Sequence, residues 1–245
     1  MFDPAESANE LVRWLKEKVE ESQREGLIFG LSGGIDSAVV AALSRRAFPE
    51  NCLGLIMPCE SNPRDREDAL LLARHIHLPV QEVDLTPVYN SFLAALNAEA
   101  DGPGDPHTSN IKPRLRMTAL YYHAARRRYL VTGTSNASEL VTGYFTKFGD
   151  AGADITPLAH LVKREVVQLA EYLDIPSPII EKPPSAGLWA GQTDEGEMGV
   201  TYEAIDAYLR DEPLAEEDRR RISLMKERSR HKRNMPAVVR PLKID

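Results

Sequence analysis

Apolar residues recur along the chain at two different spacings. Near the N-terminus, Leu11, Leu15 and Val19 lie four residues apart, which predicts a first helix that ends near Gly26. Farther along, apolar residues form short continuous runs, and runs of this length are typical of buried parallel strands. The four runs are residues 27–31, 52–57, 79–83 and 129–132.

Helical spacing returns between and after these runs. The helices predicted here cover residues 36–46, 65–76 and 114–128. A chain that alternates strands with helices forms βαβ units with right-handed crossovers. We therefore predict an α/β fold, with a doubly wound, mostly parallel sheet and helices on both faces. Ligands bind such sheets at the carboxyl ends of the strands.

Three segments do not follow this alternation. Residues 100–111 are rich in turn-forming residues and have no apolar period. Residues 175–199 contain many prolines and glycines, which predicts a long, lid-like surface loop. Residues 219–245 begin with a strongly basic stretch, and we expect a flexible tail that becomes ordered over bound substrate. With the alternating segments they predict a single domain over residues 1–245.

Composition narrows the classes of protein that fit. The chain has 245 residues, of which 42% are hydrophobic, and this suffices to bury a full core. The formal net charge of −7 argues against nucleic acids and membrane surfaces as partners, so an anionic substrate must meet local groups of basic residues. Cys52 and Cys59 form no Cys-x-x-Cys pair, and the N-terminus has no signal-peptide pattern. We therefore expect a cytoplasmic protein.

One short loop carries the clearest chemical pattern. It follows the first predicted strand and reads Ser-Gly-Gly-Ile-Asp-Ser over residues 32–37. Glycines let backbone N–H groups approach a phosphate, and the N-terminus of the following helix favours negative charge. The loop has no lysine, which excludes the Walker A pattern, and a plain glycine-rich turn is the alternative. The predicted ATP-binding residues here are Gly30, Leu31, Ser32, Gly33, Gly34, Ile35, Asp36 and Ser37.

The same hexapeptide resembles the pyrophosphate-binding loop of the N-type ATP pyrophosphatases. That group includes GMP synthetases, asparagine synthetases and NAD synthetases, and the resemblance implies an adenine nucleotide alpha hydrolase-like fold. It also implies that ATP is split between its α and β phosphates. Pyrophosphate then leaves, AMP is transferred to a substrate carboxylate, and a nitrogen nucleophile attacks the resulting acyl adenylate.

Further blocks narrow the resemblance. Residues 131–154 read VTGTSNASELVTGYFTKFGDAGAD, and they are accompanied by KPRLRM at 112–117, KPPSAGLWAGQTDEGEMG at 182–199 and HKR at 231–233. In this order the blocks resemble those of ammonia-dependent NAD synthetases. The resemblance implies a ligase that converts deamido-NAD, ATP and ammonia into NAD, AMP and pyrophosphate. It also implies a homodimer, and the chain has neither the length nor the cysteine setting of a glutaminase domain.

The resemblance assigns residues around ATP. Asp36 and Glu139 both follow strand ends, and two carboxylates with phosphate oxygens suit Mg²⁺. Lys163 is expected to meet the phosphates, while Thr134 and Ser185 are expected to contact ATP. From the sequence alone, Glu139 is also explained as a solvated glutamate, Lys163 as a surface lysine and Thr134 as part of a helix cap.

The resemblance also assigns a site for deamido-NAD. Basic side chains suit its diphosphate and its carboxylate, and an aspartate accepts a hydrogen bond from a ribose hydroxyl. The predicted residues are Arg114, Lys147, Asp154, His231 and Lys232.

Asp150 is predicted to be catalytic together with Lys163. An acidic residue beside the adenylate holds ammonium and accepts its proton, because only the neutral amine has a free lone pair. A turn aspartate is the alternative, favoured by Gly149 and Gly152. Relatives usually carry two consecutive glycines after this aspartate, whereas this chain has Ala151, which disfavours positive φ at that position.

Other classes of function remain open at this stage. A different amide ligase with the same loop would lack the block at residues 131–154. A non-catalytic ATP-binding module would not need Asp36, Glu139 and Lys163 together. The basic stretch after residue 219 also fits a nucleic-acid patch, although the acidic remainder of the chain and the block at 231–233 oppose that interpretation.

Overall fold

The computed structural model describes residues 2–98, 105–189 and 191–239. Its centre is a four-stranded sheet in which every neighbouring pair of strands is parallel. The strands are β1 (Gly26–Gly30), β2 (Cys52–Ile56), β3 (Val80–Glu82) and β4 (Tyr129–Val131), in the order β3-β2-β1-β4. Each overlaps one of the predicted apolar runs.

The direction of winding reverses at β1. The chain proceeds outward from β1 to β2 and β3, and then returns to place β4 on the other side of β1. Open parallel sheets bind ligands at the carboxyl ends of the strands beside such a reversal. The segments that follow β1 and β4 therefore border the expected site.

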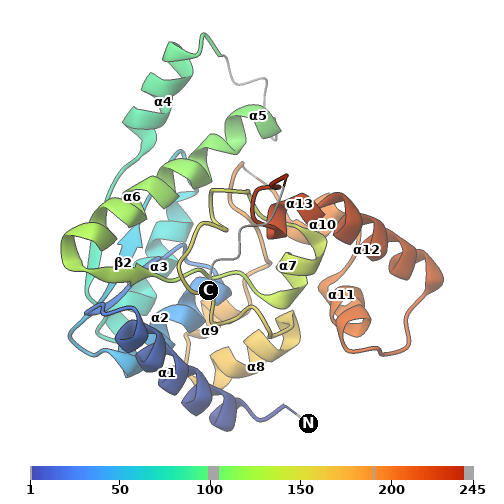
Figure 1. Cartoon of the computed structure of the whole chain (residues 1–245), viewed down its shortest axis with the longest axis horizontal. Helices are drawn as coiled ribbons and strands as arrows, with labels where there is room; N and C mark the ends of the chain where they lie inside the picture. Colours follow the sequence, from blue (N-terminus) through green and yellow to red (C-terminus); the bar gives the residue numbers. More distant parts are fainter. Residues whose placement is uncertain (1, 99–104, 190, 240–245) are drawn as a thin grey trace.

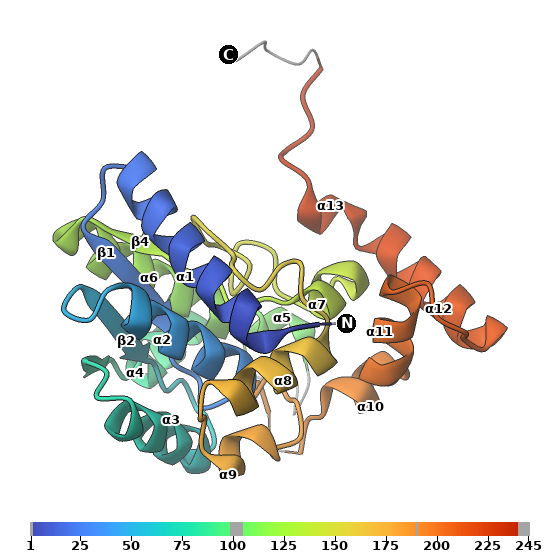
Figure 2. The same ribbon diagram turned by 90° about the horizontal axis from the view of Figure 1, so that it is seen from below.

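Helices cover both faces of the sheet, as Figures 1 and 2 show from two directions. Those near the sheet are α1 (Pro4–Glu21), α2 (Ile35–Ala47), α3 (Pro63–His75), α4 (Thr86–Ala95), α5 (Pro106–Ser109), α6 (Ile111–Arg127), α7 (Ala137–Thr142), α8 (Lys163–Tyr172) and α9 (Ser177–Ile180). The remaining helices are α10 (Asp194–Met198), α11 (Tyr202–Leu209), α12 (Glu216–Arg228) and α13 (Arg230–Arg233).

Side-chain alternation along β1 explains the two faces. Leu27 and Phe29 are fully buried in a core with apolar residues of α1, α2, α3, α8 and α9. Ile28 points the other way, into a smaller core that includes Tyr89 of α4 and Ala124 of α6. Successive residues of a strand face opposite sides, so an apolar run covered on both faces is what a doubly wound sheet requires. The predicted fold class is confirmed.

A third apolar cluster lies apart from the sheet. It joins α7, α10, α11 and α12, and its fully buried members are Ile205 and Ile222. We call residues 199–233 the arm. In Figures 1 and 2, α11 and α12 stand to one side of the sheet, while α13 turns back toward α7. The arm therefore shares a small apolar core with α7 and α10.

The basic stretch after residue 219 contains the end of α12 and all of α13, which are helices that the sequence analysis did not predict. Acidic residues fill the first turn of α12 and basic residues fill its last turn, which suits the helix dipole. Burial of Ile222 then fixes one side of the helix. Residues 234–239 have no regular structure, and residues 240–245 lie outside the described part of the chain.

Two further segments differ from the sequence prediction. The predicted loop at 175–199 contains the short helices α9 and α10, and residues 105–111 contain α5 and the start of α6. Proline occupies an early position of both α5 and α9, where its missing N–H costs nothing. The rest of the predicted loop, residues 100–104, lies outside the described residues. Among the described helices, none is long and apolar enough to cross a membrane.

Candidate active site

The predicted phosphate loop forms a compact turn at the end of β1. The hydroxyl oxygens of Ser32 and Ser37 lie 3.0 Å apart, and Ser37 Oγ donates to the carbonyl of Gly34 at 2.9 Å. Gly33 has φ of +79°, and a Cβ placed there would lie 2.3 Å from the Asp65 carbonyl oxygen. Glycine is therefore required at position 33. Gly30 and Leu31 lead into the turn, and Ile35, Asp36 and Ser37 begin α2.

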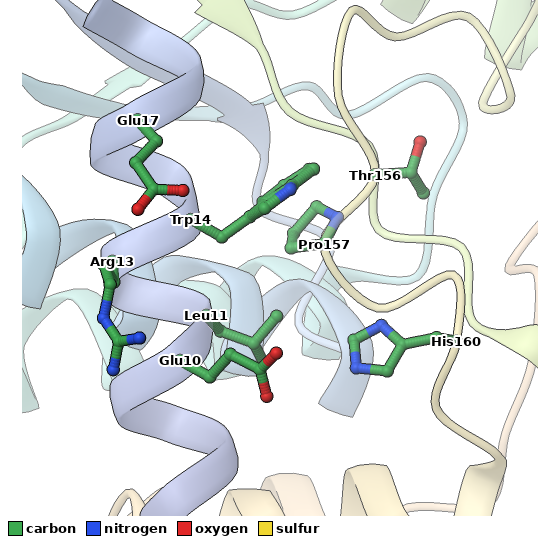
Figure 3. A pocket seen from close by; sticks show the side chains of 8 residues that line it. All are labelled: Glu10, Leu11, Arg13, Trp14, Glu17, Thr156, Pro157 and His160. Carbon is green, nitrogen blue, oxygen red and sulfur yellow. The ribbon is translucent and has the colours of Figure 1, made fainter.

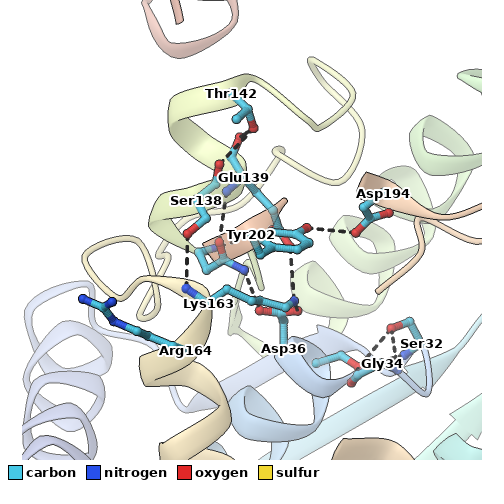
Figure 4. A network of polar contacts seen from close by, with 12 residues as sticks. Ser32, Gly34, Asp36, Ser138, Glu139, Thr142, Lys163, Arg164, Asp194 and Tyr202 are labelled. Carbon is cyan, nitrogen blue, oxygen red and sulfur yellow. Dashed lines mark hydrogen bonds and ion pairs between the residues drawn. The ribbon is translucent and has the colours of Figure 1, made fainter. Parts of the chain in front are cut away.

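Lys163 lies between the two predicted metal ligands, as Figure 4 shows. Its Nζ atom is 2.5 Å from Asp36 Oδ2 and 3.9 Å from Glu139 Oε1. Asp36 comes from α2 and Glu139 from α7, the helices that follow β1 and β4. Asn136 donates to the other Asp36 oxygen at 2.7 Å. The reversal of the sheet thus brings together three residues that are far apart in sequence.

The charges of Asp36, Glu139 and Lys163 act on one another at short distance. Burial and the nearby Asp36 charge raise the pKa of Glu139 well above its ordinary value, although Lys163 opposes the shift. Burial by itself lowers the pKa of Lys163, but Asp36 and Glu139 outweigh burial and raise it. The lysine therefore stays protonated, and its side chain is only 8% exposed. Because burial and the Asp36 carboxylate disfavour the charged form of Glu139, a further positive charge beside it would be favoured.

Asp206 holds the backbone of Lys163 in place, and the sequence analysis missed it. Its carboxylate accepts from the backbone N–H groups of Lys163 at 3.1 Å and Arg164 at 2.8 Å, and from Ser138 Oγ at 2.6 Å. Asp206 is 1% exposed and belongs to α11. It therefore caps α8 from a distant helix, since Val162 at the N-cap has no side chain that accepts a hydrogen bond.

Tyr202 and Asp194 complete the surroundings of Lys163. The Lys163 ammonium lies 5.0 Å from the centre of the Tyr202 ring, and Tyr202 donates its hydroxyl to Asp194 at 2.9 Å. Burial raises the pKa of Asp194, while its bond from Tyr202 lowers it. Both residues lie in or beside the quoted block at 182–199, but no spacing rule pointed to this contact.

The other two predicted ATP contacts lie on separate segments. Thr134 follows β4 and is half-buried. Ser185 is exposed, and its hydroxyl accepts from the Gly187 N–H at 3.1 Å. The segment that carries Ser185 is attached to α3 by Lys182, which contacts Asp65 and Asp68. Lys182 is another residue that the sequence analysis left without a role.

Four of the five residues predicted for deamido-NAD lie together. Arg114 donates to the carbonyl of Lys147 at 3.4 Å, and Lys147 Nζ donates to the carbonyl of His231 at 2.6 Å. Lys232 Nζ donates to the carbonyls of Gly143 and Phe145, each at 2.8 Å. A hollow of about 400 Å³ beside this group is lined by Lys147, His231 and parts of α12 and α13.

Asp154 lies on the α6 side of β4. Its carboxylate accepts from the backbone N–H of Val131 at 2.8 Å and from the Tyr121 hydroxyl at 3.0 Å. These bonds tie the segment after Asp150 to the sheet edge. In the described part of the chain, Asp154 forms no side-chain hydrogen bond or ion pair with the other four predicted substrate residues.

Asp150 sits in a tight turn close to basic residues. Its Oδ1 atom accepts from the Thr146 N–H at 2.9 Å. Protein atoms crowded around the carboxylate raise its pKa, while Thr146, Lys232 and Arg116 oppose the shift. The residue as a whole is exposed, and its bond from Thr146 fixes the carboxylate within the turn. Phe148, with φ of 59°, takes the left-handed position of this turn, so Ala151 meets no conflict there.

A separate cavity of about 380 Å³ lies between α1 and residues 156–160. Figure 3 shows Trp14 and Glu10 of α1 facing Pro157 and His160 across it. None of the predicted site residues lines this cavity. It therefore has no part in the arrangement around Lys163.

Comparison with known proteins shows the family of this chain. The NAD synthase family model matches residues 7–236. The NH(3)-dependent NAD(+) synthetase of Carboxydothermus hydrogenoformans is 51% identical over 95% of this chain and 96% of its own. The structure of an NMN synthetase from Francisella tularensis superposes with a TM-score of 0.92 at 41% identity, covering 97% of this chain and 99% of that one. An NH3-dependent NAD synthetase from Campylobacter jejuni gives 0.80 at 31% identity, covering 98% and 100%. This chain belongs to the NAD synthase family.

Proposed function

We propose that this protein makes NAD from deamido-NAD, ATP and ammonia. The observation that carries the proposal is the position of Lys163 between Asp36 and Glu139, beside the phosphate loop and at the reversal of the sheet. In the first step, the nicotinate carboxylate attacks the α phosphorus of ATP and pyrophosphate leaves. In the second, ammonia attacks the acyl carbon, AMP leaves, and a proton passes to a base.

Lys163 and the phosphate loop supply positive potential in the first step. The amides at the start of α2 and the Lys163 ammonium are fixed before substrate arrives, so little reorganisation is needed when charge develops at phosphorus. Leu31, Ser32 and Gly34 border the same turn, and Thr134 and Ser185 are proposed to contact ATP from neighbouring segments. Asp36 and Glu139 raise the pKa of Lys163 and keep its ammonium charged, which supports the proposed role of Lys163 at the phosphates.

Asp36 and Glu139 fit a magnesium site shared with ATP. Magnesium prefers one or two carboxylates, with phosphate oxygens and water as its other ligands. The raised pKa of Glu139 means that an added cation beside these carboxylates would relieve their repulsion. When bound, Mg²⁺ would neutralise phosphate charge.

Replacing Glu139 by glutamine tests this site without breaking α7. Glutamine keeps the capping box with Asn136 but removes the charge. We expect the Mg²⁺ concentration for half-maximal stabilisation of the protein by Mg·ATP to rise by about tenfold or more. The measurement is thermal unfolding at fixed ATP across a Mg²⁺ titration. An unchanged titration would remove Glu139 from the metal site.

The basic group around Lys147 is proposed to bind deamido-NAD. Lys147 and His231 line one hollow, Arg114 and Lys232 lie beside it, and basic side chains suit a diphosphate and a carboxylate. Asp154 is proposed to accept from a ribose hydroxyl, with lone pairs that its two bonds leave free.

A homodimer is part of the same proposal. Exposed apolar residues gather on α4 and α6, which lie on one side of the sheet: Val88 and Phe92 on α4, and Tyr121 and Tyr122 on α6. A second copy covering these residues would bury them. The interface elements that we propose are the helix at residues 114–128 and the first helix.

Asp150 is proposed to hold ammonium and accept its proton. Replacing it with asparagine keeps an acceptor for the Thr146 N–H but removes the base. General-base assistance is typically worth about 100-fold or more, so we expect the rate at low ammonium to fall about 100-fold and to recover partly at high pH. The measurement is the NAD formation rate across ammonium concentration and pH. An unchanged profile would leave Asp150 as a turn residue.

Nicotinate mononucleotide is a second candidate substrate. The relative with the TM-score of 0.92 is an NMN synthetase, and the same two steps would amidate a mononucleotide. The two candidates differ in the AMP half of the substrate. Comparing kcat/KM for the dinucleotide and the mononucleotide distinguishes them directly.

The experiment that tests the function uses purified protein with Mg²⁺, ATP and deamido-NAD, and adds either ammonium or glutamine. We expect NAD and AMP in equal amounts with ammonium alone. ATP binding without either product would instead support a non-catalytic ATP-binding module.

A further inference from the structure

Lys182 joins three parts of the molecule around the phosphate loop. Its Nζ atom lies 2.8 Å from Asp65 Oδ1 and 2.6 Å from Asp68 Oδ2, both on α3. It also donates to the carbonyl of Gly33 at 3.4 Å. Lys182 itself lies three residues before Ser185. One ammonium therefore connects α3, the phosphate loop and the segment that carries Ser185.

The cluster is well shielded from solvent. The side chain of Lys182 is 22% exposed, and those of Asp65 and Asp68 are 24% and 9% exposed. Burial alone lowers the pKa of Lys182, but its two carboxylate partners outweigh burial and raise it. Exposed ion pairs contribute little, whereas removing one member of a shielded cluster leaves uncompensated charge. Loss of Lys182 would therefore leave the charges of Asp65 and Asp68 uncompensated.

The geometry leaves little freedom around the cluster. Any side chain at Gly33 would collide with the Asp65 carbonyl, so the phosphate loop and α3 are in direct contact. A Cβ at Gly187 would lie 3.5 Å from Asp65 Oδ2, which places the Ser185 segment on the same carboxylate. Lys182 is the cation among these three contacts.

We propose that Lys182 is a positioning residue for ATP: it fixes the Ser185 segment against the phosphate loop. The identity of the nucleotide rests on the proposed function. A rival explanation is that Lys182 only neutralises charge. Two carboxylates and one ammonium give the cluster a net charge of −1, and without the ammonium it would be −2, close to where the ATP phosphates bind.

Two variants separate tethering from neutralisation. Lys182→Met keeps an unbranched side chain but loses both the tether and the charge. The double variant Lys182→Met/Asp65→Asn also lacks the tether but restores the net charge of −1. Binding of a non-hydrolysable ATP analogue to each full-length protein is measured by calorimetry with Mg²⁺ present. The double variant has no extra carboxylate charge, so it keeps the test decisive if the single variant does not fold.

We expect both variants to bind the analogue about tenfold or more weakly than the unmodified protein. We also expect KM for ATP to rise while KM for deamido-NAD stays near its original value, which a general loss of structure would not produce. Wild-type binding by the double variant would overturn the proposal and leave neutralisation as the role of Lys182. Binding of the analogue by the single variant with the affinity of the unmodified protein would overturn both explanations, tethering and neutralisation.

Arg66→Ala is the matched control. Arg66 also lies on α3 and pairs with Glu82, through two hydrogen bonds of 2.8 Å, but this pair is more exposed and contacts β3 rather than the phosphate loop. We expect its analogue binding to be unchanged. Because the binding assay needs no turnover, a protein that binds the analogue but makes no NAD would refute the proposed function and leave the Lys182 result standing.

Discussion

Replacing Lys163 by alanine is expected to slow AMP formation by about 100- to 1000-fold. The ammonium lies 2.5 Å from Asp36 and 3.9 Å from Glu139, so its loss leaves two carboxylates facing each other where phosphate charge develops. A preorganised donor in a shielded site is worth several kcal/mol because it needs no reorganisation during the reaction, commonly about 3 to 4 kcal/mol. The measurement is the rate of AMP and pyrophosphate release at saturating ATP and deamido-NAD.

Arg164→Ala supplies the control for that experiment. Arg164 is the next residue of α8, and its guanidinium forms an exposed ion pair with Glu212, pointing away from the carboxylates around Lys163. Its removal is expected to change the rate by less than about twofold, because exposed pairs contribute little. A loss of less than about tenfold in Lys163→Ala would argue against a role at the phosphates.

Replacing Asp206 by alanine is expected to lower the free energy of unfolding by about 3 kcal/mol. The carboxylate is 1% exposed and accepts three hydrogen bonds, two of them from the backbone at the start of α8. Removing it leaves buried donors without a partner, which costs more than the net value of each bond. In a chain of this length such a loss lowers the melting temperature by roughly 10 °C.

The same variant also tests whether Asp206 positions Lys163. Glu203→Ala, an exposed change on the same helix, is the control and is expected to leave both melting temperature and activity near their original values. Below its melting temperature, Asp206→Ala is expected to lose activity as well as stability. Full activity in the folded variant would show that the cap stabilises α8 without setting the position of Lys163.

The sheet was predictable because its strands are short apolar runs covered on both faces. Leu27, Ile28 and Phe29 are all buried, so the run is continuous and needs no alternation to be recognised. The helix at residues 86–95 and the helical part of the basic segment were missed for a different reason. The apolar faces of these helices are narrow, or they pack against residues that are distant in sequence. Ile222 of α12, in the small core that the arm shares with α7 and α10, is an example. Tertiary burial, rather than local pattern, decides such segments.

The residues of the candidate site also divide into those that the sequence predicts and those that it does not. Asp36, Glu139 and Lys163 were predicted because motifs carry them, and the structure brings them together. Asp206 was not predicted, because it caps a helix 43 residues away in the sequence, and no local spacing encodes that contact. Lys182 was visible inside a quoted block, yet its partners on α3 depend on how the chain returns to the phosphate loop.

The arm supports two regions of the molecule at once. Through Asp206 of α11 it holds the start of α8, and through Lys232 of α13 it holds the carbonyls of Gly143 and Phe145. Because the arm carries both attachments, we expect a displacement of α11 on ATP binding to be felt where deamido-NAD is expected to bind. Thermodynamic linkage makes that effect mutual, so the two substrates are expected to influence each other's affinity by the same factor. A tag or partner that pulls on the C-terminal helices would therefore disturb the affinities for both.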